Sequence, residues 1–120
     1  MSVAEARRLS PDDFIIGATA KTVDQAEQAE RDGADYLGVG AVFPSPTKKD
    51  AIRITREQLK EICSSVTIPA VAIGGIGKEN IGALTGSGID GVAVVSALFH
   101  KEDIRAAAVK LKREVYKIIL

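Results

Sequence analysis

Four short apolar runs rich in β-forming residues constrain the fold of this chain more than any other feature. They lie near residues 14–18, 35–40, 69–74 and 91–95. Each run is apolar at consecutive positions rather than at every second one, which is typical of strands buried on both faces of a parallel sheet. Helical patterns separate the runs, and parallel neighbours need such crossover connections. The sequence therefore predicts an α/β fold with a parallel sheet.

The ends of two connecting helices are marked by their residues. Thr22 with Gln25 three positions later is the spacing of a capping box, and Gly33 is placed to end the helix that they open. Thr55 and Gln58 repeat the spacing before the second connecting segment. Both segments are therefore predicted to be helices.

Two further helices and a short leading helix complete the pattern. A helix is expected from Lys78 toward Gly86 and Gly88, where the glycines end it. After Asp103, apolar residues recur at intervals of three and four, at Ile104, Ala108, Leu111, Val115 and Ile118. This stripe predicts a last helix that covers a face of the sheet.

Two architectures satisfy this order of elements in a single domain over residues 1–120. One is a small, open, doubly wound sheet. The other is half of a (β/α)8 TIM barrel, with four parallel βα units preceded by a short helix; a whole barrel usually needs about 250 residues. The length of 120 residues favours the open sheet, and the motifs favour the barrel. The similar segments GADYLGVG and GIDGVAVV indicate repetition of the βα unit.

Composition excludes several classes of function. Lys and Arg number 16, as do Asp and Glu, so no excess positive charge attracts nucleic acid or an anionic membrane. No basic leader with an apolar run and no membrane-spanning stretch is recognised. One cysteine, Cys63, forms no internal disulfide and fits a reducing compartment, so a cytoplasmic location is expected. One histidine, His100, gives no support to a nucleophilic triad or dyad.

Two of the predicted strands end in residues suited to phosphate. IPAVAIGGIGKEN ends in Gly74 and Gly75, whose missing Cβ atoms let an anion approach backbone N–H groups. VAVVSALF leads through Val95 to Ser96 and a helical turn. Consecutive strand ends of this kind form the phosphate site of many β/α barrels. Each alone is also typical of an ordinary turn.

Two other predicted strands are followed by hydroxyl and ammonium groups. GVGAVFPSPTKKDA holds Ser45, Thr47 and Lys48 on a segment that its prolines restrict, and IIGATAKT holds Thr19 and Lys21. These groups suit a phosphate or diphosphate. A solvated surface loop and an exposed lysine are the alternatives.

Taken together, IIGATAKTVDQA, GADYLGVGAVFPSPTKKDA, IPAVAIGGI and GIDGVAVVSALF resemble the second half of thiamine-phosphate synthase. The resemblance covers nearly the whole chain and implies a transferase of thiamine biosynthesis. Enzymes of this family join hydroxymethylpyrimidine diphosphate to a thiazole phosphate, use Mg2+, and release diphosphate. The resemblance implies that the pyrimidine diphosphate is bound by Thr19, Ser45, Thr47 and Lys48, and the thiazole phosphate by Gly75, Val95 and Ser96.

The resemblance also implies a dissociative mechanism. The carbon–oxygen bond of the diphosphate ionises, the thiazole nitrogen captures the pyrimidine cation, and Lys48 stabilises the departing diphosphate as the catalytic residue. In the family, the first four strands supply the carboxylates that hold Mg2+, and those motifs are absent from this sequence, where the motif loops offer only Asp50. No metal ligand is therefore assigned.

Three expectations follow from this resemblance. The chain alone is expected to bind phosphate while making little product, and to self-associate as a homodimer or larger assembly, because a half barrel leaves two strand edges and an apolar face uncovered. A non-catalytic, self-assembling half barrel is one alternative. A relative of thiazole tautomerase is another, although that enzyme relies on a histidine in the loop where this chain has Lys21.

Overall fold

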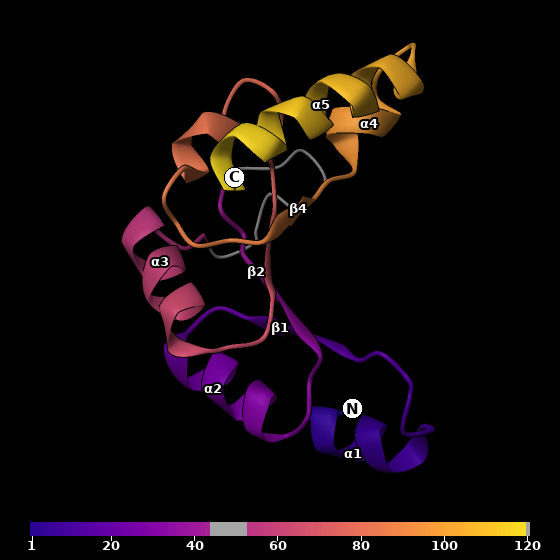
Figure 1. The fold of residues 1–120 in the computed structure, drawn as a ribbon, viewed down its shortest axis with the longest axis vertical. Helices are drawn as coiled ribbons and strands as arrows, with labels where there is room; N and C mark the ends of the chain where they lie inside the picture. Colours follow the sequence, from indigo (N-terminus) through magenta and orange to yellow (C-terminus); the bar gives the residue numbers. More distant parts are fainter. Residues whose placement is uncertain (44–52, 120) are drawn as a thin grey trace.

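The computed structural model describes residues 1–43 and 53–119, which form a four-stranded parallel sheet with helices packed against it (Figure 1). The strands lie side by side in sequence order. Their bounds are Gly17–Ala20 for β1, Tyr36–Val39 for β2, Ala70–Ile73 for β3 and Gly91–Ala93 for β4.

One short helix precedes the sheet, and each strand is followed by helical structure. The bounds are Val3–Leu9 for α1, Val23–Arg31 for α2, Arg56–Ser65 for α3, Ile81–Leu84 for the 3-10 helix η1, Ser96–Phe99 for α4 and Ile104–Ile119 for α5. The predicted arrangement of four parallel βα units after a short helix is confirmed.

The order of the strands decides between the two architectures. A doubly wound sheet reverses its strand order once and carries helices on both faces. Here the order is β1-β2-β3-β4 without reversal. Right-handed crossovers then place every connecting helix on the same face, and Figure 1 shows α2, α3 and α5 along the outer side of the curved sheet. This is the arrangement of successive units in a β/α barrel.

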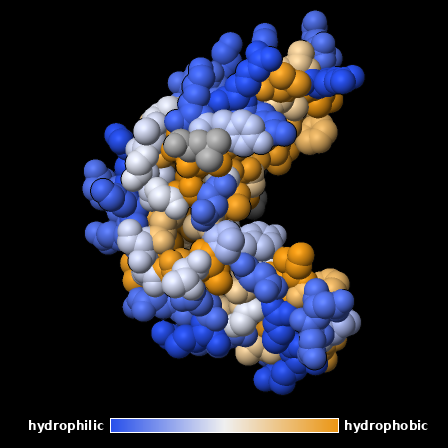
Figure 2. Space-filling model, viewed as in Figure 1, coloured by the Kyte–Doolittle hydropathy of each residue, from blue (hydrophilic) through white to orange (hydrophobic). Residues whose placement is uncertain are grey.

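The two faces of the sheet differ in burial. On the helix side, Leu37 and Val39 of β2 are fully buried in one apolar core with Leu59 and Ile62 of α3. On the other side, Tyr36 and Ile73 are each 42% exposed. Figure 2 shows apolar side chains along the hollowed side of the molecule. The sheet therefore has one covered face and one open face.

The repeated Gly-x-Asp segments make the same contacts in two places. The Asp35 carboxylate accepts a hydrogen bond from the Ile16 N–H at 2.7 Å, and the Asp35 N–H donates to the Ile16 carbonyl at 2.7 Å. Asp90 makes the same pair of bonds with Ala70, at 2.9 and 2.8 Å. The internal similarity of the sequence thus corresponds to repeated strand pairing.

The first strand begins later than predicted. The sequence placed it near 14–18, but pairing starts at Gly17, opposite Tyr36. Phe14 and Ile15 are 56% and 71% exposed, and the Phe14 carbonyl accepts a hydrogen bond from the Arg7 guanidinium at 2.8 Å. Apolar character alone does not make a strand here, because Phe14 and Ile15 have no strand to pair with among residues 1–43 and 53–119.

The prediction of a helix from Lys78 toward Gly86 and Gly88 is also wrong. Only η1 forms, and Gly86 and Gly88 take positive φ angles of 80° and 87°. The Asn80 side chain accepts a hydrogen bond from the Gly77 N–H at 2.8 Å, so it competes with helical hydrogen bonds at the start of the segment.

No helix of residues 1–43 and 53–119 is long and apolar enough to cross a membrane.

Candidate phosphate-binding site

The carboxyl ends of all four strands lie at one edge of the sheet, because the strands are parallel. Thr19 is the next-to-last residue of β1, Gly75 comes two residues after β3, and Ser96 three residues after β4. The structure therefore places these three predicted site residues at the same edge. The predictions for Ser45, Thr47, Lys48 and Asp50 lie outside the described residues.

Gly75 and Ser96 line one groove of about 610 Å³. It lies between the segment that leads into η1 and the helices α4 and α5. Basic side chains from both walls border it, namely Lys78, His100, Lys101 and Lys110. Of the two carboxylates there, Asp103 already accepts a hydrogen bond from the Ala106 N–H at 3.0 Å and caps α5. The groove is suited to an anion with several negative oxygens.

The backbone at the end of β3 is held in an uncommon shape. Gly74 and Gly75 have φ angles of 104° and 67°, which side chains rarely allow. The Asn80 amide donates to the Gly75 carbonyl at 2.8 Å while its oxygen accepts from Gly77. Asn80 is thus a site residue that the sequence analysis missed, although an asparagine three positions after a glycine turn is a recognisable signal.

The chain on both sides of residues 44–52 is fixed to this edge. The Phe43 N–H donates to the Gly74 carbonyl at 3.1 Å, and the Ile54 N–H donates to the Ala41 carbonyl at 2.9 Å. A Cβ atom added to Gly74 would lie 2.8 Å from the Cα of Ala41. The β3 end and the segment after β2 are therefore in direct contact.

The Lys21 side chain is hydrogen-bonded to Gly40, the residue that follows the neighbouring strand β2. Its ammonium group donates to the Gly40 carbonyl at 3.0 Å, and its backbone N–H donates to the Gln25 side chain at 2.8 Å. The sequence alone is compatible with two roles for Lys21, a phosphate-binding residue or a lysine that is only exposed to solvent. The structure places its charge between the ends of β1 and β2.

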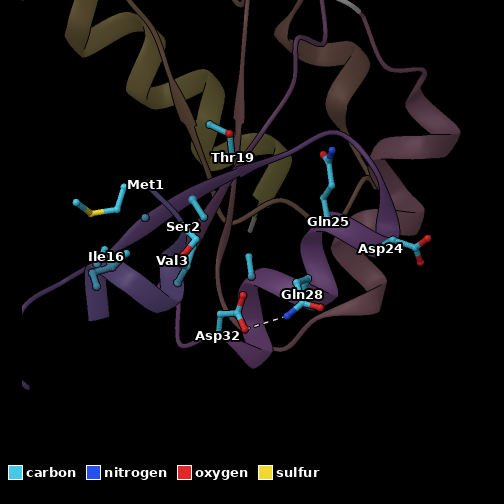
Figure 3. Close-up of a pocket in the computed structure, with 13 residues that line it drawn as sticks. Met1, Ser2, Val3, Ile16, Thr19, Asp24, Gln25, Gln28 and Asp32 are labelled. Carbon is cyan, nitrogen blue, oxygen red and sulfur yellow. Dashed lines mark hydrogen bonds between the residues drawn. The ribbon is translucent and has the colours of Figure 1, made fainter. Parts of the chain in front are cut away.

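Thr19 does not line the groove of Gly75 and Ser96. It borders a second groove of about 760 Å³ that follows β1 between α1 and α2. Figure 3 shows Thr19 at one end of this groove, with Asp24 and the hydrogen-bonded pair Gln28 and Asp32 farther along α2. Two carboxylates, Asp24 and Asp32, make the α2 side of this second groove unfavourable for an anion, whereas Thr19 lies at its other end. This groove runs alongside β1, the outermost strand, and does not cross the carboxyl ends of the other strands.

A family model described as thiamine monophosphate synthase matches residues 1–98. The chain belongs to the thiamine monophosphate synthase family. It is 50% identical to a thiamine-phosphate synthase of Clostridium tetani over 105 residues, covering 88% of this chain and 50% of that protein. It is 47% identical to thiamine-phosphate synthase 2 of Streptococcus pneumoniae strain TIGR4 over 119 residues, covering 99% of this chain and 57% of that protein.

A solved structure agrees with this family membership. Thiamine phosphate pyrophosphorylase from Pyrococcus furiosus has a TM-score of 0.90 and 42% identity to this chain, covering 100% of it and 57% of the pyrophosphorylase. The chain thus spans about half the length of the curated relatives that it matches. The parallel sheet with alternating helices is a shared fold.

Among the residues that the structure describes, the remaining polar groups form neither a cluster of metal ligands nor an activated nucleophile. Within residues 1–43 and 53–119, no three His, Cys, Asp or Glu side chains come together to hold a metal ion. The described residues therefore offer no cluster of carboxylates for Mg2+, whose protein ligands are carboxylates and other hard oxygens. Burial, with a smaller effect of Asp90, raises the pKa of the Cys63 thiol to about 11, so the thiol stays protonated and unreactive at neutral pH.

Proposed function

We propose that this chain serves in the synthesis of thiamine phosphate by holding the phosphate groups of the two substrates at the carboxyl ends of its strands. The reaction joins hydroxymethylpyrimidine diphosphate to a thiazole phosphate and releases diphosphate. One observation carries the proposal: Gly75 and Ser96 line the same groove in a chain whose whole length matches a thiamine phosphate pyrophosphorylase.

The thiazole phosphate is assigned to the groove lined by Gly75 and Ser96, with Val95 beside it. Gly75 presents backbone without a side chain, Ser96 adds a hydroxyl, and Val95 is 63% exposed at the same strand end. The lysines that border the groove supply positive charge. Charge-assisted hydrogen bonds of this kind are stronger than neutral ones, so a phosphate is favoured over an uncharged ligand.

The diphosphate is assigned to Thr19, Ser45, Thr47 and Lys48. Ionisation of the carbon–oxygen bond leaves negative charge on the departing diphosphate, and the thiazole nitrogen then captures the pyrimidine cation. Lys48 is proposed to stabilise the diphosphate, and its loss is expected to lower the rate about 10²–10³-fold, as for other preorganised groups of this kind.

We further propose that the 120-residue chain alone makes little thiamine phosphate and self-associates through its open sheet face. The exposed side chains of Tyr36 and Ile73 on that face support association, as do the two edge strands, β1 and β4. Light scattering that finds a monomer, or rapid synthesis by the monomer, would contradict this part of the proposal. The proposed compartment is the cytoplasm, in keeping with a single, unpaired cysteine.

The test of phosphate binding is a residue-resolved NMR titration of the chain with inorganic phosphate. We expect the amide signals of Gly75 and Ser96 to shift together with one dissociation constant. Ser96→Ala is expected to weaken that binding, whereas Ser64→Ala, whose hydroxyl only donates to the Lys60 carbonyl within α3, serves as the matched control. Absence of shifts at Gly75 and Ser96 at millimolar phosphate would refute the proposed function.

A further inference from the structure

We propose that Lys21 is an additional substrate-contacting residue, whose ammonium group binds the diphosphate between the ends of β1 and β2. The inference rests on the proposed function and assigns one more positive charge to the diphosphate end of the site. Four observations support it: a fixed backbone, a directed side chain, no carboxylate partner among the described residues, and open space beside it.

The backbone of Lys21 is fixed by the start of α2. Its N–H donates to the Gln25 side-chain oxygen at 2.8 Å, and the Gln25 N–H in turn donates to the Thr22 hydroxyl at 3.1 Å. Thr22 is the N-cap of α2. The Cα of Lys21 is therefore held by both the strand that precedes it and the helix that follows it.

The side chain is directed across the end of the sheet. Ala20 pairs with Val39, so Lys21 stands opposite Gly40 at the next position, and its ammonium group reaches the Gly40 carbonyl at 3.0 Å. Because this bond holds a long side chain in one direction, less rotamer entropy is lost when a ligand binds. The Lys21 side chain is therefore preorganised for a ligand at the carboxyl ends of β1 and β2.

The charge of Lys21 has no carboxylate partner among residues 1–43 and 53–119. The two ion pairs in this part of the chain join Arg7 to Asp35 and Lys117 to Glu114. An ammonium group has three N–H donors, and the carbonyl of Gly40 accepts one of them. Within the part of the chain that the structure describes, two donors and the full positive charge remain for an anion.

Space for that anion exists on the open face of the sheet. Thr19 lies in β1, Lys21 follows the last residue of that strand, and the Lys21 ammonium group reaches across the strand ends to the Gly40 carbonyl. Opposite Thr19 stands Gly38, where an added Cβ atom would meet no atom within 4 Å. A hydroxyl and an ammonium group thus border space that no described side chain fills.

The position of Lys21 separates it from the groove of Gly75 and Ser96. The ammonium group of Lys21 lies at the Gly40 carbonyl, at the end of β2, whereas Ser96 follows β4, two strand spacings or about 10 Å away at about 4.8 Å per spacing. One phosphate cannot touch both places. Two separate anion sites agree with a reaction in which both substrates carry phosphate.

The experiment titrates the 120-residue chain with inorganic diphosphate at constant ionic strength and follows backbone amides by NMR. We expect Thr19 and Gly40 to report one dissociation constant and Gly75 another. In Lys21→Gln, the side-chain amide can still donate to Gly40 but carries no charge. It is expected to weaken the affinity reported by Gly40 about tenfold, or 1.4 kcal/mol, and to change the affinity reported by Gly75 less than twofold.

Two further variants separate charge from structure. Lys21→Arg keeps the charge and is expected to retain the affinity reported by Gly40 within about threefold. Lys60→Gln removes an exposed lysine of α3 and is expected to change neither affinity. Circular dichroism melts establish that each variant is folded.

The outcomes distinguish this inference from the proposed function. Equal affinity of the wild type and Lys21→Gln at Gly40, or no signal change at Gly40 while Gly75 responds, overturns the role of Lys21 and leaves the proposed function standing. Equal weakening by Lys21→Arg and Lys21→Gln also overturns it, since the charge would then have no role. No response at Gly75 refutes the proposed function itself.

Discussion

Replacing Gly74 by alanine tests whether the contact between the β3 end and the segment after β2 is as close as the structure has it. Gly74 has a φ angle of 104°, in the region that favours glycine. An added Cβ atom would lie 2.8 Å from both the Cα and the Cβ of Ala41. The substitution therefore strains the backbone and pushes against a neighbouring main chain.

The two effects have known sizes. A non-glycine residue held in the left-handed region costs about 1–3 kcal/mol. Inserting a methyl group where the surroundings are already in contact costs about 1–3 kcal/mol more, because the obstacle is backbone and cannot rotate away. We expect Gly74→Ala to lower the free energy of unfolding by about 2–6 kcal/mol, which is a large part of the stability of a small domain.

The assay is urea denaturation followed by circular dichroism, with Gly38→Ala as the matched control. At Gly38 an added Cβ atom meets nothing within 4 Å and φ is not positive. This control is expected to be neutral or stabilising by about 0.4–1 kcal/mol, because alanine restricts the unfolded chain. If the two variants unfold at the same urea concentration as the wild type, the close approach of Gly74 to Ala41 is refuted.

Three other predictions concern stability and reactivity. Leu59→Ala removes a fully buried core side chain and is expected to cost about 2–5 kcal/mol in urea denaturation; a loss below 1 kcal/mol would contradict the core. Hydrogen bonds from the Ile16 N–H and then from Arg7 lower the pKa of Asp35, so its stabilising effect is present above the usual pKa of an aspartate and is lost as pH falls through the lowered value. Asp35→Asn is therefore expected to reduce the acid-induced loss of stability, and an unchanged pH profile of the urea midpoint would oppose this. Cys63, with a pKa raised to about 11, is expected to react with a disulfide reagent far more slowly in the folded chain than in urea, and equal rates would oppose its burial.

Features that depend on nearby residues were predictable from the sequence. Thr55 and Gln58 form the expected capping box, with bonds of 3.1 and 2.7 Å, since both partners lie within one turn. At the start of α2 the same spacing gives a different result, because the Gln25 side chain binds the N–H of Lys21 rather than that of Thr22. Local patterns thus predicted where the helices begin. Which backbone N–H donates to the glutamine side chain depended on the preceding strand.

Features that depend on neighbouring strands were not predictable. The true start of β1 follows from where Tyr36 offers a partner, and periodicity carries no information on that. The bond between Lys21 and Gly40 has the same origin, since it joins residues 19 positions apart through the register of β1 and β2. The common edge of Thr19 and the β3 and β4 ends was predictable, because it follows from parallel direction alone.

Asp35 and Asp90, the third residues of the two repeated segments, hold the strand register from the amino ends of the strands. Asp35 and Asp90 each bind one residue at the start of the preceding strand through both backbone and side chain. Sliding a strand by one residue would break both bonds and turn its side chains to the opposite face. The alignment of Thr19 with Gly38 is thus set at the amino ends of the strands, so substitutions at those carboxylates are expected to displace residues at the opposite, carboxyl ends that they do not contact.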